Sequence, residues 1–405
     1  MSTSVLYHAY GIVGYELAST RFEDGETVFH VRRKDDGWNC PECGWLDVIR
    51  RGTTRRRWRT LPIGRRTTWI ECDVQRIECR RCGVIRQANV GFAEPKKRHT
   101  KAFARLALQL SQMSTIQDVA TFLGVSWDTI KELQKADLKR RYGRIKLKKL
   151  RWIGIDEISI GHGHRYLTVV LDLKTGAVVY VGKGKGAEAL DGFWKRLAAS
   201  RARILAVAID MSKAYYRAVT DHLPKAKIIF DHFHIIKLLN EKLTILRREL
   251  FDEATSKLQQ KILKGTRWLL LKDPKNLNAK HDEKKRLDRA LQLNAPLACA
   301  YYLKEDLRRG LWSQNNRPDA EAFLDDWCSR AEASAIPILV KFAHLLLGYR
   351  SAILAWYDYP ISNGPLEGTN NKIKTMQRMA YGYRDEEFFL LKIYALHECK
   401  YALVG

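Results

Sequence analysis

Three acidic residues that lie far apart in the sequence each occupy a position from which a carboxylate could bind a divalent metal ion. Asp156 ends the segment Arg-Trp-Ile-Gly-Ile-Asp, Asp210 ends the apolar run Ile-Leu-Ala-Val-Ala-Ile-Asp, and Glu367 lies within Ser-Asn-Gly-Pro-Leu-Glu-Gly-Thr-Asn-Asn-Lys. Mg²⁺ prefers oxygen ligands, and two such ions about 3.5–4 Å apart stabilise the attacking and the leaving oxygen of a phosphodiester together. If folding brings the three carboxylates together, the sequence predicts a site for two Mg²⁺ or Mn²⁺ ions, suited to nuclease or strand-transfer chemistry.

The residues beside the two aspartates indicate which acidic side chains face this site. Consecutive residues of a strand point to opposite faces, so Asp156 and Glu157 cannot both face it. Asp156 follows the apolar residues, and Glu157 is expected at the rim. Asp210 could instead cap the helix that follows it, a role compatible with metal binding. Asp231 and His234, in the motif Asp-His-Phe-His directly after another apolar run, are predicted to be accessory residues that orient a ligand or a phosphate.

The segment around Glu367 carries further polar residues. On its own, Glu367 could serve only to complement the positive end of a helix dipole. Its neighbours favour a functional site, because Asn-Gly-Pro allows a close backbone approach and the amides and lysines that follow could contact phosphate groups. The predicted DNA-binding residues of this segment are Asn370, Asn371, Lys372 and Lys374.

Two cysteine pairs indicate a second metal site of a different kind. Cys40-Pro-Glu-Cys43 and Cys79-Arg-Arg-Cys82 are each followed by glycine and are separated by 35 residues. Short Cys-x-x-Cys turns present two thiolates to one ion, and four thiolates bind Zn²⁺ tetrahedrally. The gap is longer than the spacing of about 15–20 residues that is common between such pairs. We therefore predict a zinc ribbon with one structural Zn²⁺, and four free core cysteines are the alternative.

The chain is strongly and unevenly basic. It has 405 residues, of which 46% are hydrophobic, and a formal net charge of +26. Residues 50–150 hold 26 Lys and Arg against 8 Asp and Glu, a net charge of +18. Because nucleic-acid phosphates would relieve this repulsion, double-stranded DNA is the expected partner, and a solvated basic loop between the cysteine pairs is the alternative. The arginines predicted to contact phosphates are Arg55, Arg56, Arg57, Arg59, Arg65 and Arg66.

The hydrophobic period becomes that of a helix between His99 and Arg141. Two apolar stripes at helical spacing are followed by Gly-Val-Ser and then by Trp-Asp-Thr-Ile-Lys-Glu-Leu, for which Ser126 is a suitable N-cap. A helix, a short turn with glycine and a second helix form the helix-turn-helix pattern, whose second helix enters the major groove. An ordinary helical hairpin is the alternative. The residues of the second helix predicted to contact DNA are Trp127, Thr129 and Lys131.

From residue 151 the order of the elements predicts an α/β core. A strand and a hairpin over 166–181 precede a helix over about 187–199, a strand over 204–209, a helix over 212–222 and a strand over 226–230. This is the order of a ribonuclease-H-like core, in which the first and fourth strands lie side by side, so Asp156 and Asp210 are expected to be neighbours. Residues 235–357 then show only helical periodicity, which indicates an all-α insertion before the helix that carries Glu367.

These patterns together predict six segments. They are N-terminal strands with a zinc-ribbon DNA-binding domain (1–98), a helix-turn-helix DNA-binding domain (99–141), a basic linker (142–150), the first part of the catalytic core (151–234), an all-helical insertion (235–360) and the C-terminal helices of the core (361–405). Residues 1–37 are expected to form short strands. The N-terminus lacks the pattern of a signal peptide and no apolar run reaches about 18 residues, so we expect a cytoplasmic, nucleoid-associated protein without a membrane partner.

The motifs resemble those of bacterial insertion-sequence transposases of the DDE type, specifically the ISL-three group. The similarity covers nearly the whole chain: the four-cysteine ribbon, the helix-turn-helix, Gly-Ile-Asp-Glu, Ala-Ile-Asp-Met-Ser, Asp-His-Phe-His, and the segment around Glu367 with Ala-Tyr-Gly-Tyr-Arg after it. The resemblance implies that Asp156, Asp210 and Glu367 form the catalytic triad. It also implies that Asp231 and His234 form the accessory motif.

The resemblance further implies an activity and partners. Each end of the element would be cleaved by metal-assisted hydrolysis, which frees a 3′ hydroxyl that attacks target DNA directly. The terminal inverted repeats would be bound by residues 38–141, and joining two ends implies a homodimer or a larger homo-oligomer. Two alternatives remain: a domesticated transposase that regulates by binding DNA without cleavage, and a structure-specific nuclease.

Overall fold

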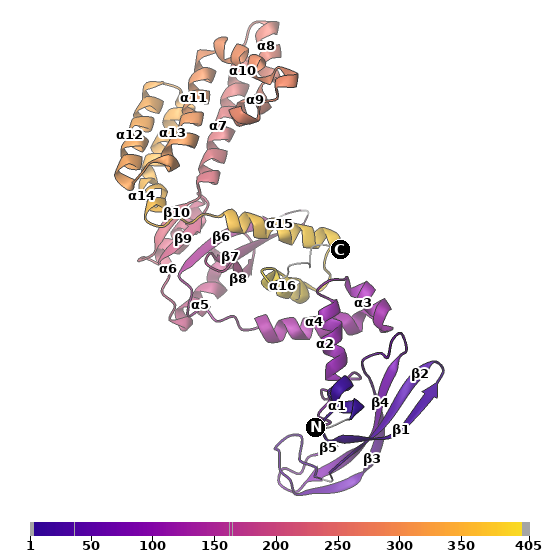
Figure 1. Cartoon of the computed structure of the whole chain (residues 1–405). Coiled ribbons are helices and arrows are strands. Elements are labelled where there is room, and N and C mark those ends of the chain that lie inside the picture. The colour runs from indigo at the N-terminus through magenta and orange to yellow at the C-terminus, as the bar shows by residue number, and fades with distance from the viewer. Residues whose placement is uncertain (1–3, 36, 162, 164, 399–405) are drawn as a thin grey trace. The chain divides into compact units, whose positions relative to one another are not determined.

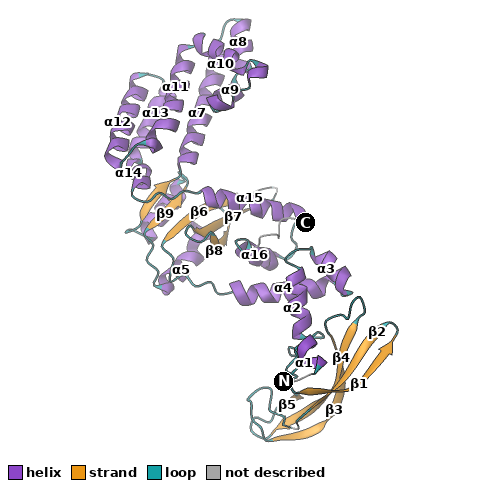
Figure 2. Ribbon diagram, viewed as in Figure 1, coloured by secondary structure: helices purple, strands orange, loops and turns teal. Residues whose placement is uncertain are grey.

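The chain divides into two compact units. The computed structural model describes residues 4–398 apart from residues 36, 162 and 164 (Figure 1). The first unit, here the N-terminal unit, comprises residues 1–144, 379–392 and 398–405, and the second, here the core unit, comprises residues 145–378 and 393–397. Each unit has its own five-stranded sheet (Figure 2).

The N-terminal unit begins with a short helix and a sheet. The strand order is β1-β2-β4-β3, with β5 also paired to β4. Strands β2 and β4 are parallel and the other pairs are antiparallel. Trp58, Ile70 and Phe92 lie in the apolar core of this sheet. The elements are α1 (Val5–Tyr10), β1 (Tyr15–Glu23), β2 (Glu26–Arg33), β3 (Val48–Arg59), β4 (Thr68–Cys79) and β5 (Ile85–Gln87).

Helix α1 corrects the expectation of strands throughout residues 1–37. Leu6 and Tyr10 lie one helical turn apart and both are buried, and Gly11 ends the helix with a positive φ of 66°. The burial of these two side chains on one helical face explains why the segment is not a strand. The expected strand character begins only at Tyr15.

Three helices follow the sheet of the N-terminal unit: α2 (Lys101–Leu110), α3 (Ile116–Leu123) and α4 (Trp127–Tyr142). The side chains of Thr115 and Ser126 cap α3 and α4 by accepting hydrogen bonds from backbone N–H groups, and Gly124 separates the two helices. Phe103 and Ile130 pack in a core shared by the three helices. The predicted helix-turn-helix, with its N-cap at Ser126, is confirmed.

The sheet of the core unit has the order β10-β9-β6-β7-β8. Strands β10, β9 and β6 are parallel, and β7 runs antiparallel to both β6 and β8. The first and fourth strands of this unit, β6 and β9, are therefore neighbours, as the sequence predicted. The elements are β6 (Trp152–Ser159), β7 (Tyr166–Asp172), β8 (Ala177–Lys183), α5 (Asp191–Ser200), β9 (Ala206–Ile209), α6 (Lys213–His222) and β10 (Lys227–Phe230).

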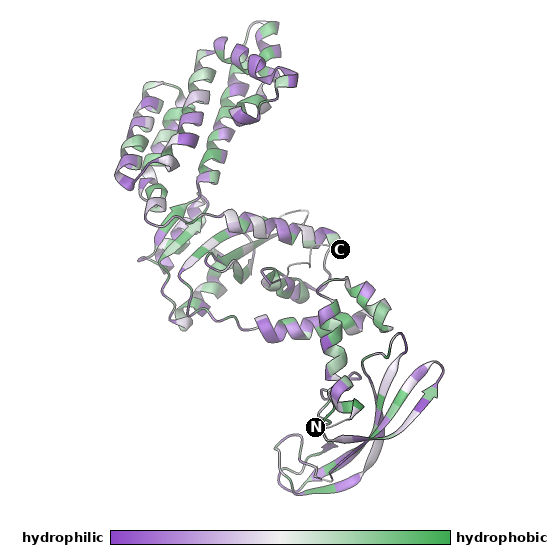
Figure 3. Ribbon diagram, viewed as in Figure 1, coloured by the Kyte–Doolittle hydropathy of each residue, from purple (hydrophilic) through white to green (hydrophobic). Residues whose placement is uncertain are grey.

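Only helices follow β10. The predicted all-α insertion is confirmed, since residues 232–360, all of which the structure describes, contain no strand. Trp327 and Phe342 lie in its apolar core, and hydrophobic and hydrophilic residues alternate along its helices (Figure 3). The helices are α7 (His232–Glu253), α8 (Lys257–Lys264), α9 (Arg267–Leu271), α10 (Glu283–Gln292), α11 (Ala295–Gly310), α12 (Arg317–Ala333), α13 (Pro337–Gly348) and α14 (Arg350–Leu354), followed by α15 (Gly364–Met379) and α16 (Glu386–Ala395).

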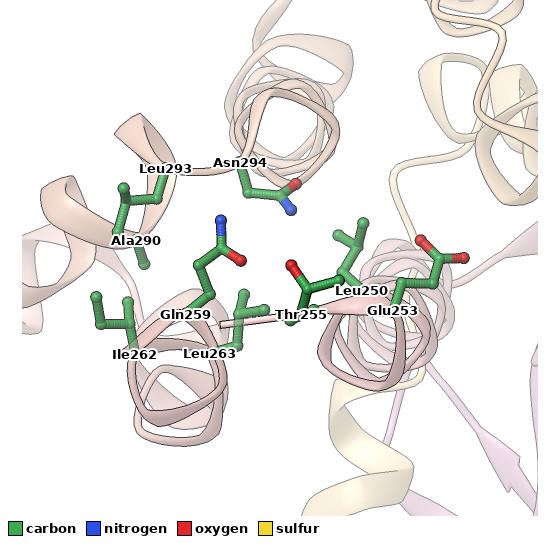
Figure 4. A pocket seen from close by; sticks show the side chains of 10 residues that line it. Leu250, Glu253, Thr255, Gln259, Ile262, Leu263, Ala290, Leu293 and Asn294 are labelled. Carbon is green, nitrogen blue, oxygen red and sulfur yellow. The ribbon is translucent and has the colours of Figure 1, made fainter. Parts of the chain in front are cut away.

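The insertion encloses a pocket of about 220 Å³. Apolar side chains of α7, α8 and α10 line much of it, and the polar ends of Gln259 and Asn294 face each other across it (Figure 4). None of the predicted site residues lines this pocket. Within the described residues, no single helix has the length and apolar character needed to cross a membrane, and one bent pair, Pro337–Gly348 with Arg350–Tyr357, passes by length and composition alone.

Candidate active site

Three aspartates lie on three adjacent parallel strands or directly after them: Asp156 within β6, Asp210 after β9 and Asp231 after β10. The strand register pairs Gly154 with Ala208, and Ala208 with Ile229. Each aspartate lies two residues after one of these paired residues, which are Gly154, Ala208 and Ile229. Side chains two residues apart point to the same face, and neighbouring strands lie about 4.8 Å apart. The sheet therefore brings the three aspartates, here the aspartate row, together on one face at one edge.

Helix α15 packs on that same face. Gly154 makes the close approach possible, because a Cβ there would lie 2.5 Å from Leu366 Cδ1 and 3.4 Å from Asn363 Oδ1. The backbone carbonyl of Asn363 accepts hydrogen bonds from the N–H groups of Leu366 and Glu367 and so begins the helix. The first turn of α15, which carries Glu367, is thus held two residues from Asp156 along β6.

Asp156 is fixed by hydrogen bonds to both of its oxygens. Oδ1 accepts the backbone N–H of Glu157 at 2.8 Å, and Oδ2 accepts the Asn370 side-chain N–H at 2.9 Å. Burial raises the pKa of Asp156 to about 6, and the nearby charges of Asp210 and Asp231 add to this rise. The electrostatic effect of the two other aspartates agrees with the strand register.

Glu157 points to the opposite face of β6, as expected from strand alternation. There it interacts with the hydroxyl of Tyr215 on α6, and burial raises the pKa of Glu157. The same Tyr215 hydroxyl lies 3.0 Å from Thr168 Oγ1. Glu157 therefore belongs to a polar cluster under α6 and lies on the other side of the sheet from Asp156.

Glu367 is near the aspartate row, but neither the three aspartates by themselves nor Glu367 with them form one compact ligand set. Its side chain is exposed, one helical turn before Asn370, which contacts Asp156. Among the described residues, only the four cysteines place three or more potential ligand atoms within 4.8 Å of one another. Two ions about 3.5–4 Å apart, each about 2.0–2.1 Å from its ligands, can be shared by carboxylates up to about 8 Å apart. Carboxylates that do not all lie within 4.8 Å of one another can therefore still share two ions.

The accessory residues lie where β10 meets α7. Asp231 is 5% exposed and precedes α7, and its backbone carbonyl accepts the N–H of His234 at 3.1 Å. The side chain of His234 is half-buried. His232 Nδ1 lies 3.5 Å from Asp231 Oδ1, and the ring of His232 packs on Trp312 of the insertion, with centroids 5.5 Å apart. The insertion thus contributes a side chain next to the aspartate row.

The polar atoms around the aspartate row suit a hard divalent cation. Asp231 Oδ1, Asn363 Oδ1 and Asn370 Oδ1 are buried oxygens without a hydrogen-bond partner among the described residues. Together with the carboxylates they form a donor set made of oxygen, which Mg²⁺ and Mn²⁺ prefer. The residues present therefore fit such ions, with Asp156, Asp210 and Asp231 as the nearest carboxylates.

The four cysteines converge as predicted. Cys40 Sγ lies 3.7 Å from Cys82 Sγ, and Cys43 Sγ lies 3.6 Å from Cys79 Sγ, and the ligand atoms of all four lie within 4.8 Å of one another. The backbone N–H of Cys43 lowers the pKa of the Cys40 thiol to about 7, which favours the thiolate that binds zinc. The long gap between the pairs is explained by the antiparallel strands β3 and β4, which occupy most of it.

The two cysteine turns have matching geometry. Gly44 and Gly83 have φ angles of 74° and 69°, and their N–H groups donate to the carbonyls of Cys40 and Cys79, each at 2.9 Å. Glycine accepts this left-handed conformation without steric cost. Each turn therefore closes after the second cysteine and directs both sulfurs toward one point, as a tetrahedral zinc site requires.

The arginine-rich segment is strand β3, and acidic residues of other strands lie opposite it. Arg55 binds Asp73 of β4 with Nε 2.9 Å from Oδ1, and Arg57 Nη2 lies 2.5 Å from Glu26 Oε2 of β2. Arg56 stacks over the ring of Trp58 and donates to Gln87. The segment itself contains no acidic residue, and its acidic partners lie on other strands of the sheet. Arg65 and Arg66 lie exposed in the turn before β4.

Arg59 occupies a structural position. It is 7% exposed, and its Nη2 donates to the backbone carbonyl of Leu123 at 2.7 Å. This carbonyl belongs to the last turn of α3, where a cation is favoured by the helix dipole. Arg59 therefore joins the sheet to the helix-turn-helix and is not presented to a DNA phosphate, which departs from its predicted role.

The three residues of α4 predicted to contact DNA are not equally available to bind it. Trp127 is exposed, and Thr129 lies at the cap of the helix, with its hydroxyl 2.9 Å from Ser126 Oγ. Lys131 already forms an ion pair, because its Nζ lies 3.1 Å from Asp385 Oδ2 in the C-terminal segment of the same unit. Asp385 and Glu387 also pair with Lys135 and Lys139, one and two turns further along α4.

The position of Asn370 departs most clearly from its predicted role as a DNA contact. It was grouped with Asn371, Lys372 and Lys374 as a DNA contact, but only those three are exposed, while Asn370 is buried against Asp156. The sequence does contain a signal for this packing. Gly154 interrupts an apolar strand, and such a glycine often marks a close backbone approach.

Comparisons with known proteins agree with this arrangement of elements. Residues 153–393 match a family model described as a transposase of the DDE type, ISL3 group. Residues 88–136 match the helix-turn-helix domain of transposase family ISL3, and residues 36–82 match the zinc-finger of transposases IS204, IS1001, IS1096 and IS1165. The three matched segments follow one another along the chain.

Similar proteins match over most of the length. The chain is 36% identical over 361 residues to the transposase for insertion sequence element IS1001 of Bordetella parapertussis, which covers 88% of each chain. It is 31% identical over 378 residues to the transposase for IS1557 of Mycobacterium tuberculosis, covering 86% of this chain and 83% of the relative. A Drosophila P element transposase strand transfer complex matches with 11% identity and a TM-score of 0.36, over 74% of this chain and 92% of that one, which is too low to establish a shared fold.

Proposed function

Because this chain belongs to the ISL3 family of transposases, we propose that it cleaves the ends of an insertion sequence and joins them to target DNA with the aid of divalent metal ions. The observation that supports this most directly is the aspartate row. Asp156 within β6 and Asp210 and Asp231 after β9 and β10 lie in register, and α15, which carries Glu367, packs on the same face. This arrangement gathers oxygen ligands at one edge of a rigid sheet.

In this proposal, Asp156, Asp210 and Glu367 are the catalytic carboxylates, and Asp231 and His234 are accessory residues. Two bound Mg²⁺ or Mn²⁺ ions would stabilise the attacking and the leaving oxygen of an in-line displacement at phosphorus. Asp156 is already held in one orientation by its two hydrogen bonds, so little reorganisation is needed when it binds. Asp210 is oriented by the backbone N–H of Ser212, which donates to its Oδ1 at 3.1 Å.

The proposed reaction has two displacements at phosphorus. In the first, a water oxygen attacks the phosphorus at the end of the element, the bond to the 3′ oxygen breaks, and that oxygen leaves as a 3′ hydroxyl. In the second, the 3′ oxygen attacks a phosphorus of the target and displaces the target's own 3′ oxygen. One P–O bond forms as another breaks, so the joining step requires no nucleotide cofactor.

The N-terminal unit would bind the terminal inverted repeats. It contains the zinc ribbon, the helix-turn-helix and the arginine-rich strand β3. Trp127 at the start of α4 and the exposed Arg65 and Arg66 are the residues best placed for DNA contact. Two ends must be joined in one event, so we propose that two or more copies of the chain assemble on DNA.

The test is cleavage of a duplex that carries the terminal repeat of the element. Full-length protein should cleave it with Mg²⁺ or Mn²⁺, and Asp210→Asn should lower the rate by about 10³-fold or more while DNA binding persists. Asp221→Asn, at an exposed aspartate of α6 in the same unit, is the matched control and should cleave normally. Binding without cleavage under any ion would support a regulator, and cleavage regardless of the terminal sequence would support a structure-specific nuclease.

A further inference from the structure

Asn370 occupies the centre of the contact between α15 and the aspartate row. It is 8% exposed, and its side-chain N–H donates to Asp156 Oδ2 at 2.9 Å. A carboxylate oxygen only accepts hydrogen bonds, so the amide nitrogen of Asn370 must face it. Because the other oxygen of Asp156 accepts the N–H of Glu157, both oxygens are held and the carboxylate has one orientation.

The amide oxygen of Asn370 has no partner among the described residues. The same is true of both polar atoms of the Asn363 side chain, which is 3% exposed and lies against Gly154. A buried polar atom left unpaired costs about 1–3 kcal/mol. Three such atoms on the face of β6 that carries Gly154 and Asp156 therefore indicate that water or an ion normally pairs with them.

The adjacent Asn371 provides an internal comparison. It follows Asn370 directly on α15, yet its side chain is exposed. Leu366, four residues before Asn370, packs on Gly154, and this sets the rotation of the helix. Residues four apart lie on one face, so Asn370 is turned toward Asp156 and Asn371 is turned away. The two asparagines have the same chemistry and different surroundings.

We propose that Asn370 is a positioning residue of the metal site. Its N–H fixes the orientation of Asp156, and its free carbonyl oxygen accepts a hydrogen bond from water bound to the divalent cation. This inference rests on the proposed function, because it assumes that Asp156 binds such a cation. It assigns Asn370 to the metal site and leaves Asn371, Lys372 and Lys374 as the residues of this segment that can contact DNA.

The experiment compares Mn²⁺ binding by full-length, zinc-loaded protein in the absence of DNA. Bound Mn²⁺ is measured by electron paramagnetic resonance, with Asp156→Ala as the baseline for binding elsewhere. Asn370→Leu keeps the approximate shape but loses the donor, and it should weaken Mn²⁺ binding roughly 10–100-fold, the usual effect of removing a hydrogen-bond partner of a ligand. Asn371→Leu should bind Mn²⁺ as the wild type does.

A second variant separates positioning from packing. Asn370→Ala leaves space in which a water molecule can replace the lost N–H, so it should retain more Mn²⁺ affinity than Asn370→Leu. If Asn370 served packing alone, the order would be reversed, because the smaller side chain leaves a cavity and loses more stability. The melting temperature of each variant, measured without Mn²⁺, shows whether the protein is folded and which order stability follows.

The outcomes distinguish this inference from the proposed function. Wild-type Mn²⁺ affinity in Asn370→Leu would overturn the inference alone. Loss of affinity for end DNA by Asn370→Leu, with Mn²⁺ binding intact, would also overturn it and return Asn370 to a DNA-contacting role. Failure of the wild type itself to bind more Mn²⁺ than Asp156→Ala would overturn the metal site, and with it both proposals.

Discussion

Asp156→Asn should stabilise the metal-free protein although it removes a carboxylate proposed to be catalytic. Burial, strengthened by the nearby acidic groups, raises the pKa of Asp156 from the ordinary value of 3.8 to about 6. Since each pKa unit is equivalent to 1.36 kcal/mol, the rise corresponds to about 3 kcal/mol by which the ionised carboxylate destabilises the folded state. The Asn side chain of the variant carries no charge and avoids this cost.

The hydrogen bonds of Asp156 can be preserved in the variant. The new amide oxygen can accept the backbone N–H of Glu157, as Oδ1 of Asp156 does. The new amide N–H can donate to the carbonyl oxygen of Asn370 if the Asn370 amide turns over, because that oxygen has no other partner among the described residues. The change in free energy of unfolding should therefore reflect mainly the lost charge.

The stabilisation by Asp156→Asn should depend on pH. The pKa of Asp156 is higher in the folded state than in the unfolded state, so its charge costs nothing below pH about 4. The cost grows as the pH rises from about 4 to about 6 and is complete above that. Asp156→Asn and the wild type should therefore have equal stability at pH 4 and differ most at pH 8.

The assay is scanning calorimetry of full-length, zinc-loaded protein without added Mg²⁺ or Mn²⁺. For a unit of this size, about 3 kcal/mol corresponds to an increase of about 6–12 °C in the melting temperature of the core unit at pH 8. Asp221→Asn, at an exposed aspartate, should change neither value. A melting temperature at pH 8 that is equal to or below that of the wild type would refute the reasoning, as would an increase of the same size at pH 4.

Four further predictions concern the N-terminal unit. Cys79→Ser should release zinc, detected with a colorimetric chelator, and lower the melting temperature of this unit while the core unit is unchanged. Arg59→Leu should destabilise the same unit by about 1–3 kcal/mol in denaturant unfolding, because a buried carbonyl of α3 loses its donor. Arg65→Ala combined with Arg66→Ala should leave the stability of the unit unchanged. This double variant should lower the slope of log affinity against log salt concentration for DNA binding by about 1.8. Asp385→Asn should free Lys131 of α4, while Lys135 keeps its pair with Glu387, and should tighten DNA binding at low salt. Unchanged or weaker binding in a fluorescence anisotropy titration would show that this ion pair only supports the fold.

The adjacency of Asp156 and Asp210 could be predicted from the sequence because it follows from the order of the elements. A strand, a hairpin, a helix and another strand leave few ways to form one sheet, and the first and fourth strands then pair. The zinc ligands could be predicted because both pairs are local turns whose glycines fix their shape. In each case the decisive information lies in a short segment or in chain order.

The surroundings of the arginines could not be predicted because they depend on strand register. Arg55 meets Asp73 and Arg57 meets Glu26 only when β3 and β2 both pair with β4. A segment that contains no acid can therefore be partly neutralised in the fold. The burial of Arg59 could not be predicted either, because it requires the end of α3 to lie beside β3.

The different positions of Asn370 and Asn371 depend on the rotation of α15 about its axis. A helical pattern shows which residues share a face, but it does not show which face meets the sheet when the partner is a single glycine. The contact between Leu366 and Gly154 supplies that information. The packing of one leucine therefore separates the buried Asn370 from the exposed residues of the same segment.

The carboxylates of the site are held by two kinds of constraint. The aspartate row is fixed by the register of β6, β9 and β10, so its geometry depends on the sheet alone. Glu367 is carried by α15, which packs on Gly154 and ends at Met379; the chain then enters a segment of the N-terminal unit in which Asp385 pairs with α4. Two chain segments therefore connect α4 with the site: residues 143–155 lead from its end to Asp156, and residues 371–384 lead from Asp385 back to Asn370.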